Sequence, residues 1–175
     1  DASITKLMEN GNHFDISLKG KAHNNHLIST FAWDNHAKER MSGMLNSTAN
    51  FFQTPDGRQV AFIGVAPSHL NIHNTIWNAE PCAISYSDKR LEINDLNIHH
   101  GNQYLMVNGI ASENDQDSIV VNLKDVDVAY ILELVNFDAV SFSGLATGQA
   151  QAKGVFGKQL HANADLIVND FKFEM

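Results

Sequence analysis

The sequence predicts an all-β fold, a curved antiparallel sheet of about ten strands. Apolar and polar residues alternate with a period of two along nearly the whole chain, as in strands with one covered and one wet face. The breaks between these runs are short and polar, and short connections between consecutive strands give an antiparallel meander. A slip in the apolar phase within one run indicates a β-bulge, which would bend the sheet.

Ten or eleven strands are expected in chain order, each from its own alternating run. They span 13–21, 27–33, 43–51, 58–66, 69–77, 82–87, 91–98, 103–111, 117–125, 143–156 and 161–173. Turn chemistry separates them, since "TPDGR" offers Pro and Gly where a turn needs a fixed or a positive φ. The stretches "SDKR", "HHGN" and "SENDQD" are polar breaks.

The slip in phase lies in "LEINDLNI" at 91–98. Its apolar positions move from 91 and 93 to 96 and 98 across Asn94 and Asp95. One extra residue in the strand would return the second pair to the face of the first, so we predict a bulge at these two residues. The sheet should curl there.

One segment departs from the strand pattern and predicts a short α-helix near 127–136. Val128, Ile131, Leu132 and Val135 follow the spacing of an amphipathic helix, and Asp127 is placed to cap its first amides. We expect a single β-rich domain over 1–175, since no Pro- or Ser-rich linker divides the chain. Because the sequence begins with Asp1, we expect it to be an internal segment of a longer protein.

The composition argues against two classes of partner. The chain carries 12 basic and 20 acidic residues, a formal charge of −8, which repels nucleic acid and anionic headgroups from the surface as a whole. Cys82 is the only cysteine, so no internal disulfide can form, and its neighbours predict a small buried side chain. No apolar run reaches the length that spans a bilayer.

The histidines invite a metal site, but their spacing does not support one. In a strand, His99 and His100 point to opposite faces, and His69 and His73 stand about 13 Å apart. His23 lies in a loop with His26, yet no second pair at zinc spacing accompanies them. We also find no nucleophile with a credible base and no phosphate-binding loop. The prediction is therefore a protein without enzymatic activity, catalytic residues, metal or cofactor.

The apolar face of the sheet remains as the candidate site. Along "FSGLATGQAQAKGVF" this face carries Gly144, Ala146, Gly148, Ala150, Ala152 and Gly154, so either a neighbouring backbone approaches closely or the space accommodates an apolar guest. Ordinary core packing is the competing interpretation for each larger residue. The side chains expected to point inward are Phe14, Ile16, Leu18, Phe62, Leu70, Ile72, Ile93, Leu105, Val107, Ile119, Val121 and Leu123.

An ordered set of motifs over about 69–173 resembles the AsmA-like superfamily, in particular TamB-type translocation and assembly proteins of the Bacteroidetes kind. The set comprises a strand ending in "INDLNI", a strand closing in "VNG", the element "VNLKDVDVAYIL" and the Gly/Ala-rich strand "SGLATGQAQAKG". Alternation alone is common, whereas this order of motifs is more specific.

The resemblance implies a periplasmic segment of a long protein anchored in the inner membrane of a Gram-negative bacterium. Such relatives fold as a "β-taco", a sheet curled into a U with a hydrophobic groove. They are associated with transport of phospholipid to the outer membrane and with assembly of β-barrel proteins there. The expected partners are a phospholipid or other acyl-chain lipid and an outer-membrane β-barrel assembly partner. The sequence lacks both the anchoring helix and a recognisable terminus for that partner.

Two other classes stay open beside this one. A self-contained β-clam or barrel could bind a small apolar ligand, and a sandwich could bind a glycan, although no cluster of aromatic residues forms a platform for one. The edges of an excised sheet also invite edge-to-edge self-association.

Overall fold

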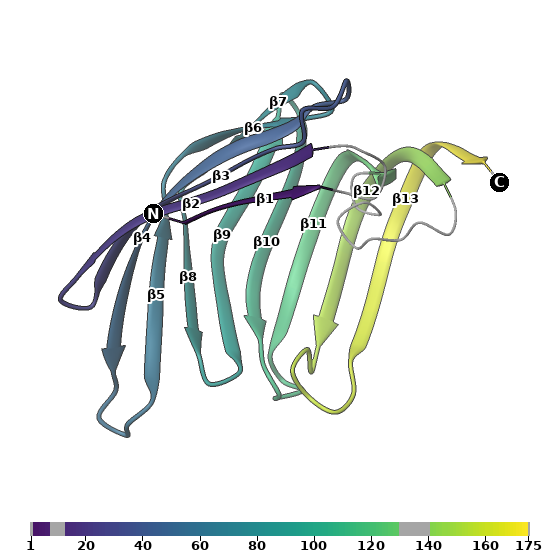
Figure 1. Cartoon of the computed structure of the whole chain (residues 1–175). Helices are drawn as coiled ribbons and strands as arrows, with labels where there is room; N and C mark the ends of the chain where they lie inside the picture. Colours follow the sequence, from purple (N-terminus) through teal and green to yellow (C-terminus); the bar gives the residue numbers. More distant parts are fainter. Residues whose placement is uncertain (1, 8–12, 130–140, 175) are drawn as a thin grey trace.

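The protein is an all-β molecule built on one strongly curved sheet (Figure 1). The computed structural model describes residues 2–7, 13–129 and 141–174. Within these residues a 13-stranded sheet has the order β1-β2-β3-β4-β5-β8-β9-β10-β11-β12-β13, with β6 and β7 attached beside β4 and β9. Neighbouring strands are antiparallel throughout. The predicted fold class is confirmed.

Apart from β6 and β7, the strands follow chain order in the sheet, and most of their connections are short, as in a meander. Their bounds are β1 (Ala2–Leu7), β2 (His13–His23), β3 (His26–Asp34), β4 (Met41–Gln53), β5 (Gln59–Val65), β6 (Ser68–Ile72), β7 (Thr75–Ala79), β8 (Cys82–Ser87), β9 (Arg90–His100), β10 (Gln103–Ala111), β11 (Ser118–Asp127), β12 (Ser141–Lys153) and β13 (His161–Glu174).

At two places in the sheet, two short strands occupy the position of one long strand, and a proline separates them. β5 and β6 lie end to end along β4, and β8 and β7 lie end to end along β9. Pro67 and Pro81 stand at the two interruptions, because a proline has no N–H to donate to the ladder. The residues just before them keep the ladder going, since the amide of Ala66 donates to Asn46 O and that of Glu80 to Asn97 O, each over 2.9 Å.

A tight hairpin replaces the single strand predicted over 69–77, and that prediction is wrong. His73 and Asn74 have φ of 49° and 64°, as the two central residues of a type I′ turn do, and β6 pairs with β7 across them. The pairs Asn24 with Asn25 and Asp88 with Lys89 also have positive φ at both positions. The loop expected between His23 and His26 is thus another two-residue turn.

The predicted bulge at Asn94 and Asp95 is confirmed. Ile93 pairs with Gly109 and Leu96 with Val107, so two residues of β9 oppose one residue of β10. Asp95 has a φ of 59°, and its amide donates to Asn108 Oδ1 over 2.7 Å. The side chain of Asn108, which faces the bulge, therefore accepts the hydrogen bond of the amide that is left unpaired in the strand ladder.

The same device recurs in two later strands. Residues 124 and 125 of β11 oppose Thr147, and residues 170 and 171 of β13 oppose Gly144. Asp125 and Asp170 have φ of 51° and 54°, and the amide of Asp125 donates to Thr147 Oγ1 over 2.9 Å. Each bulge increases the local twist and bends its strand, and together they account for curvature in the C-terminal half of the sheet.

The core lies at one end of the curved sheet, where the sheet packs against itself. We call this the closed end. Trp77 is 3% exposed and belongs to one cluster with Leu123 and Ala146, which come from strands far from it in the sheet order. Trp33 and Leu45 of the N-terminal strands pack against this cluster. We call the face that meets itself here the inner face.

The helix predicted near 127–136 falls largely outside the described residues. The chain is helical at residues 128 and 129, where the described part stops. Asp127 Oδ1 accepts the amide of Ala129 over 3.0 Å, which is the cap that the sequence predicts.

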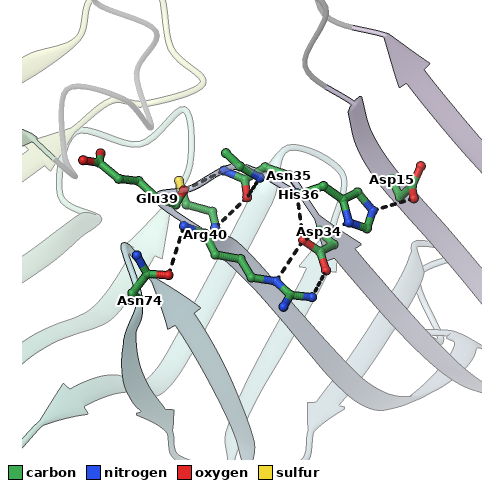
Figure 2. A network of polar contacts seen from close by, with 9 residues as sticks. Asp15, Asp34, Asn35, His36, Glu39, Arg40 and Asn74 are labelled. Atoms are coloured by element: carbon green, nitrogen blue, oxygen red, sulfur yellow. Dashed lines mark hydrogen bonds and ion pairs between the residues drawn. The ribbon is translucent and has the colours of Figure 1, made fainter.

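A polar network ties the rim of the closed end (Figure 2). Asn74 Nδ2 of the β6–β7 turn donates to Lys38 O over 2.9 Å, so the turn holds the connection between β3 and β4. Within that connection Asp34 accepts two hydrogen bonds from Arg40, and His36 Nε2 lies 2.7 Å from Asp15 Oδ2 of β2. The guanidinium of Arg40 holds the pKa of Asp34 below its ordinary value. Three chain segments are thereby joined, namely β2, the end of β3 with its connection to β4, and the β6–β7 turn.

Candidate functional site

An unbroken apolar row crosses the inner face from β2 to β13. Residues directly opposite one another in antiparallel strands share a face, so the register alone defines the row. With nine steps of about 4.8 Å it is roughly 43 Å long. Its members are Ala22, Leu27, Ala49, Ile63, Ile84, Ile93, Gly109, Ile119, Ala152 and Ala162.

The row lies toward the end of the sheet opposite the core, which we call the open end. The turns at 54–58, 88–89, 112–117 and 154–160 lie at this end, at the bottom of Figure 1. On the same face, Phe51 and Tyr86 are 44% and 47% exposed. Most of the row is only half-buried, with Ala49 as its buried member. The inner face is thus packed at one end and partly bare at the other.

An apolar hollow of about 300 Å³ lies where the row reaches β11, β12 and β13. A volume of this size is at the lower limit for small-molecule pockets. Its apolar side chains are Ile119, Val121, Ala150, Ala152, Ala162 and Ala164.

The small-residue face of β12 has two explanations at different positions. Gly148 has a φ of 145°, and a Cβ built on it would lie 2.1 Å from Asp165 O, so the backbone of β13 requires a glycine there. Gly144 is similar, with Asn169 O at 2.9 Å from such a Cβ. Ala150 and Ala152 instead border the apolar hollow. Close backbone approach accounts for these two glycines, and the alanines leave space.

Ten of the twelve side chains predicted to point inward lie on the inner face. The register places them there with the apolar row; they are Ile16, Leu18, Leu70, Ile72, Ile93, Leu105, Val107, Ile119, Val121 and Leu123. Leu70 and Leu123 are core residues of the closed end, whereas Ile93 and Ile119 belong to the row. Contact of any of them with a lipid stays a prediction.

Phe62 is the one residue placed on the wrong face. It pairs with Asn50 and Ser85, so it lies on the outer face, where it is 44% exposed. Its neighbours Ala61 and Ile63 occupy the inner face instead. The side chain of Phe14 lies outside the described part of the structure, and only its backbone pairing with Lys6 is given.

The inner face also contains residues that the sequence analysis did not select. Trp33 and Trp77 are prominent among them, since they pack at the closed end. Leu27 and Ile84 belong to the apolar row, but their strands do not alternate strictly, since Ile28 follows Leu27 and Ala83 precedes Ile84. The sequence therefore did not show which side of these two strands faces inward.

The histidines form pairs at the strand ends and turns. His99 Nε2 lies 2.8 Å from Glu80 Oε1, and His100 Nδ1 donates to Ile76 O over 2.8 Å while its ring contacts Trp77. His73 ends the β6 strand in a turn, so the strand spacing predicted for it does not apply. Across the described ranges, no group of three His, Cys, Asp or Glu side chains is arranged to hold a metal ion.

Cys82 lies on the inner face between the core and the row. It is 8% exposed and pairs with Val65. Burial raises the pKa of its thiol, which keeps it in the unreactive protonated form. The predicted small buried side chain is confirmed.

Comparisons with family models, with curated proteins and with solved structures gave no match to this chain. In the portion of the chain that is described, no helix has the length and apolar character needed to cross a membrane.

Proposed function

We propose that this chain is a periplasmic segment of an AsmA-like, TamB-type protein whose inner face receives acyl chains of lipids. The observation that carries the proposal is the apolar row, which runs from β2 to β13 and is only partly covered at the open end. No catalytic group is needed for this function. Burial of apolar surface supplies the binding free energy.

The magnitude of the hydrophobic effect favours a lipid over a small polar ligand on this face. Each CH₂ buried is worth about 0.8 kcal/mol, so an acyl chain with ten buried methylenes would gain roughly 8 kcal/mol before the cost of its immobilisation. The row also passes through the hollow beside Ala150 and Ala152, where an alkyl chain meets no bulky side chain.

The bulges support the proposed kinship. The motif "INDLNI" contains Asp95, "VNG" contains Asn108 and Gly109, and the third motif contains Asp125. In this chain these residues form or face bulges, as described above. The motifs that carry the resemblance are therefore those that bend the sheet, which gives the resemblance a physical basis.

Both ends of the sheet leave a hydrogen-bonding edge. β1 and β13 end the strand order and pair on one side only among the described residues, so these residues do not form a closed barrel. In a longer protein such edges could receive the neighbouring strands. Edge-to-edge association of the segment stays a prediction that sedimentation at increasing protein concentration would test. Pairing with an outer-membrane β-barrel assembly partner also stays a prediction.

Lipid retention tests the proposed function. Protein purified from bacterial membranes without harsh detergent should carry phospholipid that mass spectrometry detects, and replacing Val107 and Val121 by Asp should remove it. Val120→Asp places the same charge on the outer face of β11 and serves as the matched control. Because the double variant could unfold, Ala152→Phe provides a second test that fills the apolar hollow without a charge. A folded Ala152→Phe protein with an unchanged lipid load, or wild-type protein without lipid, would refute the proposal.

A further inference from the structure

A second hollow, different in chemistry from the first, lies over β10, β11, β12 and β13. It measures about 510 Å³, within the range of small-molecule sites. Most of its side chains alternate with those of the inner face, which puts them on the outer face. We call the following set the polar hollow: Tyr104, Asn122, Thr147, Gln149, Gln151, Asn163 and Asp165.

The side chains of the polar hollow select for an uncharged polar ligand. Lys, Arg and His are absent from its described lining, so an anion finds no counter-charge there. Asp165 is its single carboxylate, and Lys124, the cross-strand neighbour of Tyr104, is not part of the lining. An apolar ligand would strip water from four amides without replacing the hydrogen bonds. The chemistry therefore favours a molecule rich in hydroxyl groups.

Two of the amides are fixed by hydrogen bonds that leave part of each group free. Gln149 Nε2 donates to Asn122 Oδ1 over 2.9 Å, and Gln151 Nε2 donates to Ser118 Oγ over 3.0 Å. Each amide has two N–H donors and a carbonyl acceptor, so Gln149 and Gln151 still offer a carbonyl and a second N–H. Their orientation is set before any ligand arrives, which lowers the entropic cost of binding.

The remaining polar groups stand opposite these amides on the edge strand. Asp165 pairs with Gln149, and Asn163 pairs with Gln151. Neither side chain has a hydrogen-bond partner among the described residues, and both are exposed. Donors and acceptors thus alternate at about 5 Å across the strands and about 7 Å along them. Tyr104 of β10 adds an aromatic residue to the lining.

We propose that the polar hollow binds a neutral oligosaccharide. The free donors and acceptors of Asn122, Gln149 and Gln151 bond the sugar hydroxyls, and the Asp165 carboxylate accepts a pair of them. One sugar ring packs its apolar face on Tyr104. The side chains that would bind the sugar lie on the outer face, whereas the lipid function is proposed for the inner face, although Gln151 and Asn163 border both hollows.

Titration of the intact chain with two uncharged sugars, cellotetraose and tetra-N-acetylchitotetraose, tests this inference by NMR. At least one should shift the side-chain amide signals of Gln149 and Gln151, with backbone shifts confined to β10–β13. The double variant Gln149→Ala with Asp165→Ala should bind that sugar at least about tenfold more weakly. Asn50→Ala is the matched control, because Asn50 is an exposed amide of β4 that is likewise hydrogen-bonded, to His26.

A variant that fails to fold can be told apart from a folded variant that fails to bind. Both replaced side chains are solvent-accessible, so the variant should keep the wild-type far-UV spectrum, and Gln149→Leu offers a second variant should it not. Absence of binding by either sugar at millimolar concentration would overturn the inference, as would equal binding by the wild type and a folded variant. Lipid content measured on the same samples is expected to stay unchanged, which distinguishes this result from a failure of the inner-face proposal.

Discussion

The closed and open ends of the sheet use the same inner face for opposite purposes. At the closed end Trp77 is 3% exposed within a cluster that joins strands far apart in the sheet, whereas at the open end Tyr86 is 47% exposed on the same face. At both ends, apolar side chains of the inner face alternate with side chains of the outer face along the strands. The difference comes from curvature, because only one end brings two parts of the sheet into contact. The apolar pattern of the sequence therefore determines which face of the sheet is the inner one, and the curvature of the sheet determines where that face is buried as a core.

The largest expected effect comes from truncating an aromatic side chain at each end. Trp77→Ala should lower the free energy of unfolding by about 3–5 kcal/mol, since it leaves a cavity where two parts of the sheet meet. Tyr86→Ala should cost no more than about 1 kcal/mol, because about half of its surface is already in water. Urea unfolding followed by circular dichroism measures both. Equal losses would mean that the two ends are packed alike and that the comparison fails.

A smaller effect is expected where a glycine lies beneath Trp33. A Cβ built on Gly43 would lie 2.4 Å from Trp33 Cζ2, so Gly43→Ala must displace the indole from the closed end and should cost about 1–3 kcal/mol. Gly64→Ala is the control, since its Cβ would meet Thr48 Oγ1 at an ordinary 3.5 Å. Thermal unfolding compares them. A Gly43→Ala protein as stable as the control would show that Trp33 is not held in place.

The smallest effect concerns the rim of the closed end and depends on pH. Arg40 lowers the pKa of Asp34 in the folded protein, while in the unfolded chain the carboxyl titrates near its ordinary value of about 3.9. The pair therefore stabilises the protein above that value, and this contribution is lost as the pH falls through the lowered pKa. Asp34→Asn should be less stable than wild type at pH 7 and should lose less stability on acidification. Unfolding midpoints at pH 7 and pH 3 measure the difference, and parallel losses would contradict it.

The sequence predicts a strand's inner side well where alternation is strict and polar residues mark the outer side. In β11, Ile119, Val121 and Leu123 were assigned correctly because Ser118, Asn122 and Lys124 mark the outer side, where Val120 is the one apolar residue among them. In β5, "VAFIGV" offers apolar residues at consecutive positions, so either phase was acceptable and Phe62 was assigned to the wrong face. When both sides of a strand are apolar, its own sequence does not show which side faces inward. Its register comes from the neighbouring strands, which the sequence does not state.

A shift in the apolar alternation marks a break in the regular strand, either a bulge or a turn. The slip at Asn94 and Asp95 predicted the bulge, yet a comparable slip between Ile72 and Trp77 passed as a continuous strand and is a hairpin. A bulge and a two-residue turn both shift the alternation, and positive φ at Asn or His permits either. The polar hollow had no signal in the sequence beyond a polar outer face. Its residues meet only because four strands align in register.

The aspartate bulges have a consequence for how such a sheet grows. They occur in β9, β11 and β13, so each successive hairpin of this half contains its own bend and needs no distant contact to acquire it. Adding another hairpin of the same kind extends the curved sheet by about 10 Å across its strands and leaves its curved cross-section unchanged. The length of such a sheet increases with the number of hairpins, and the width of its concave side is fixed by where along each strand the extra residue is inserted.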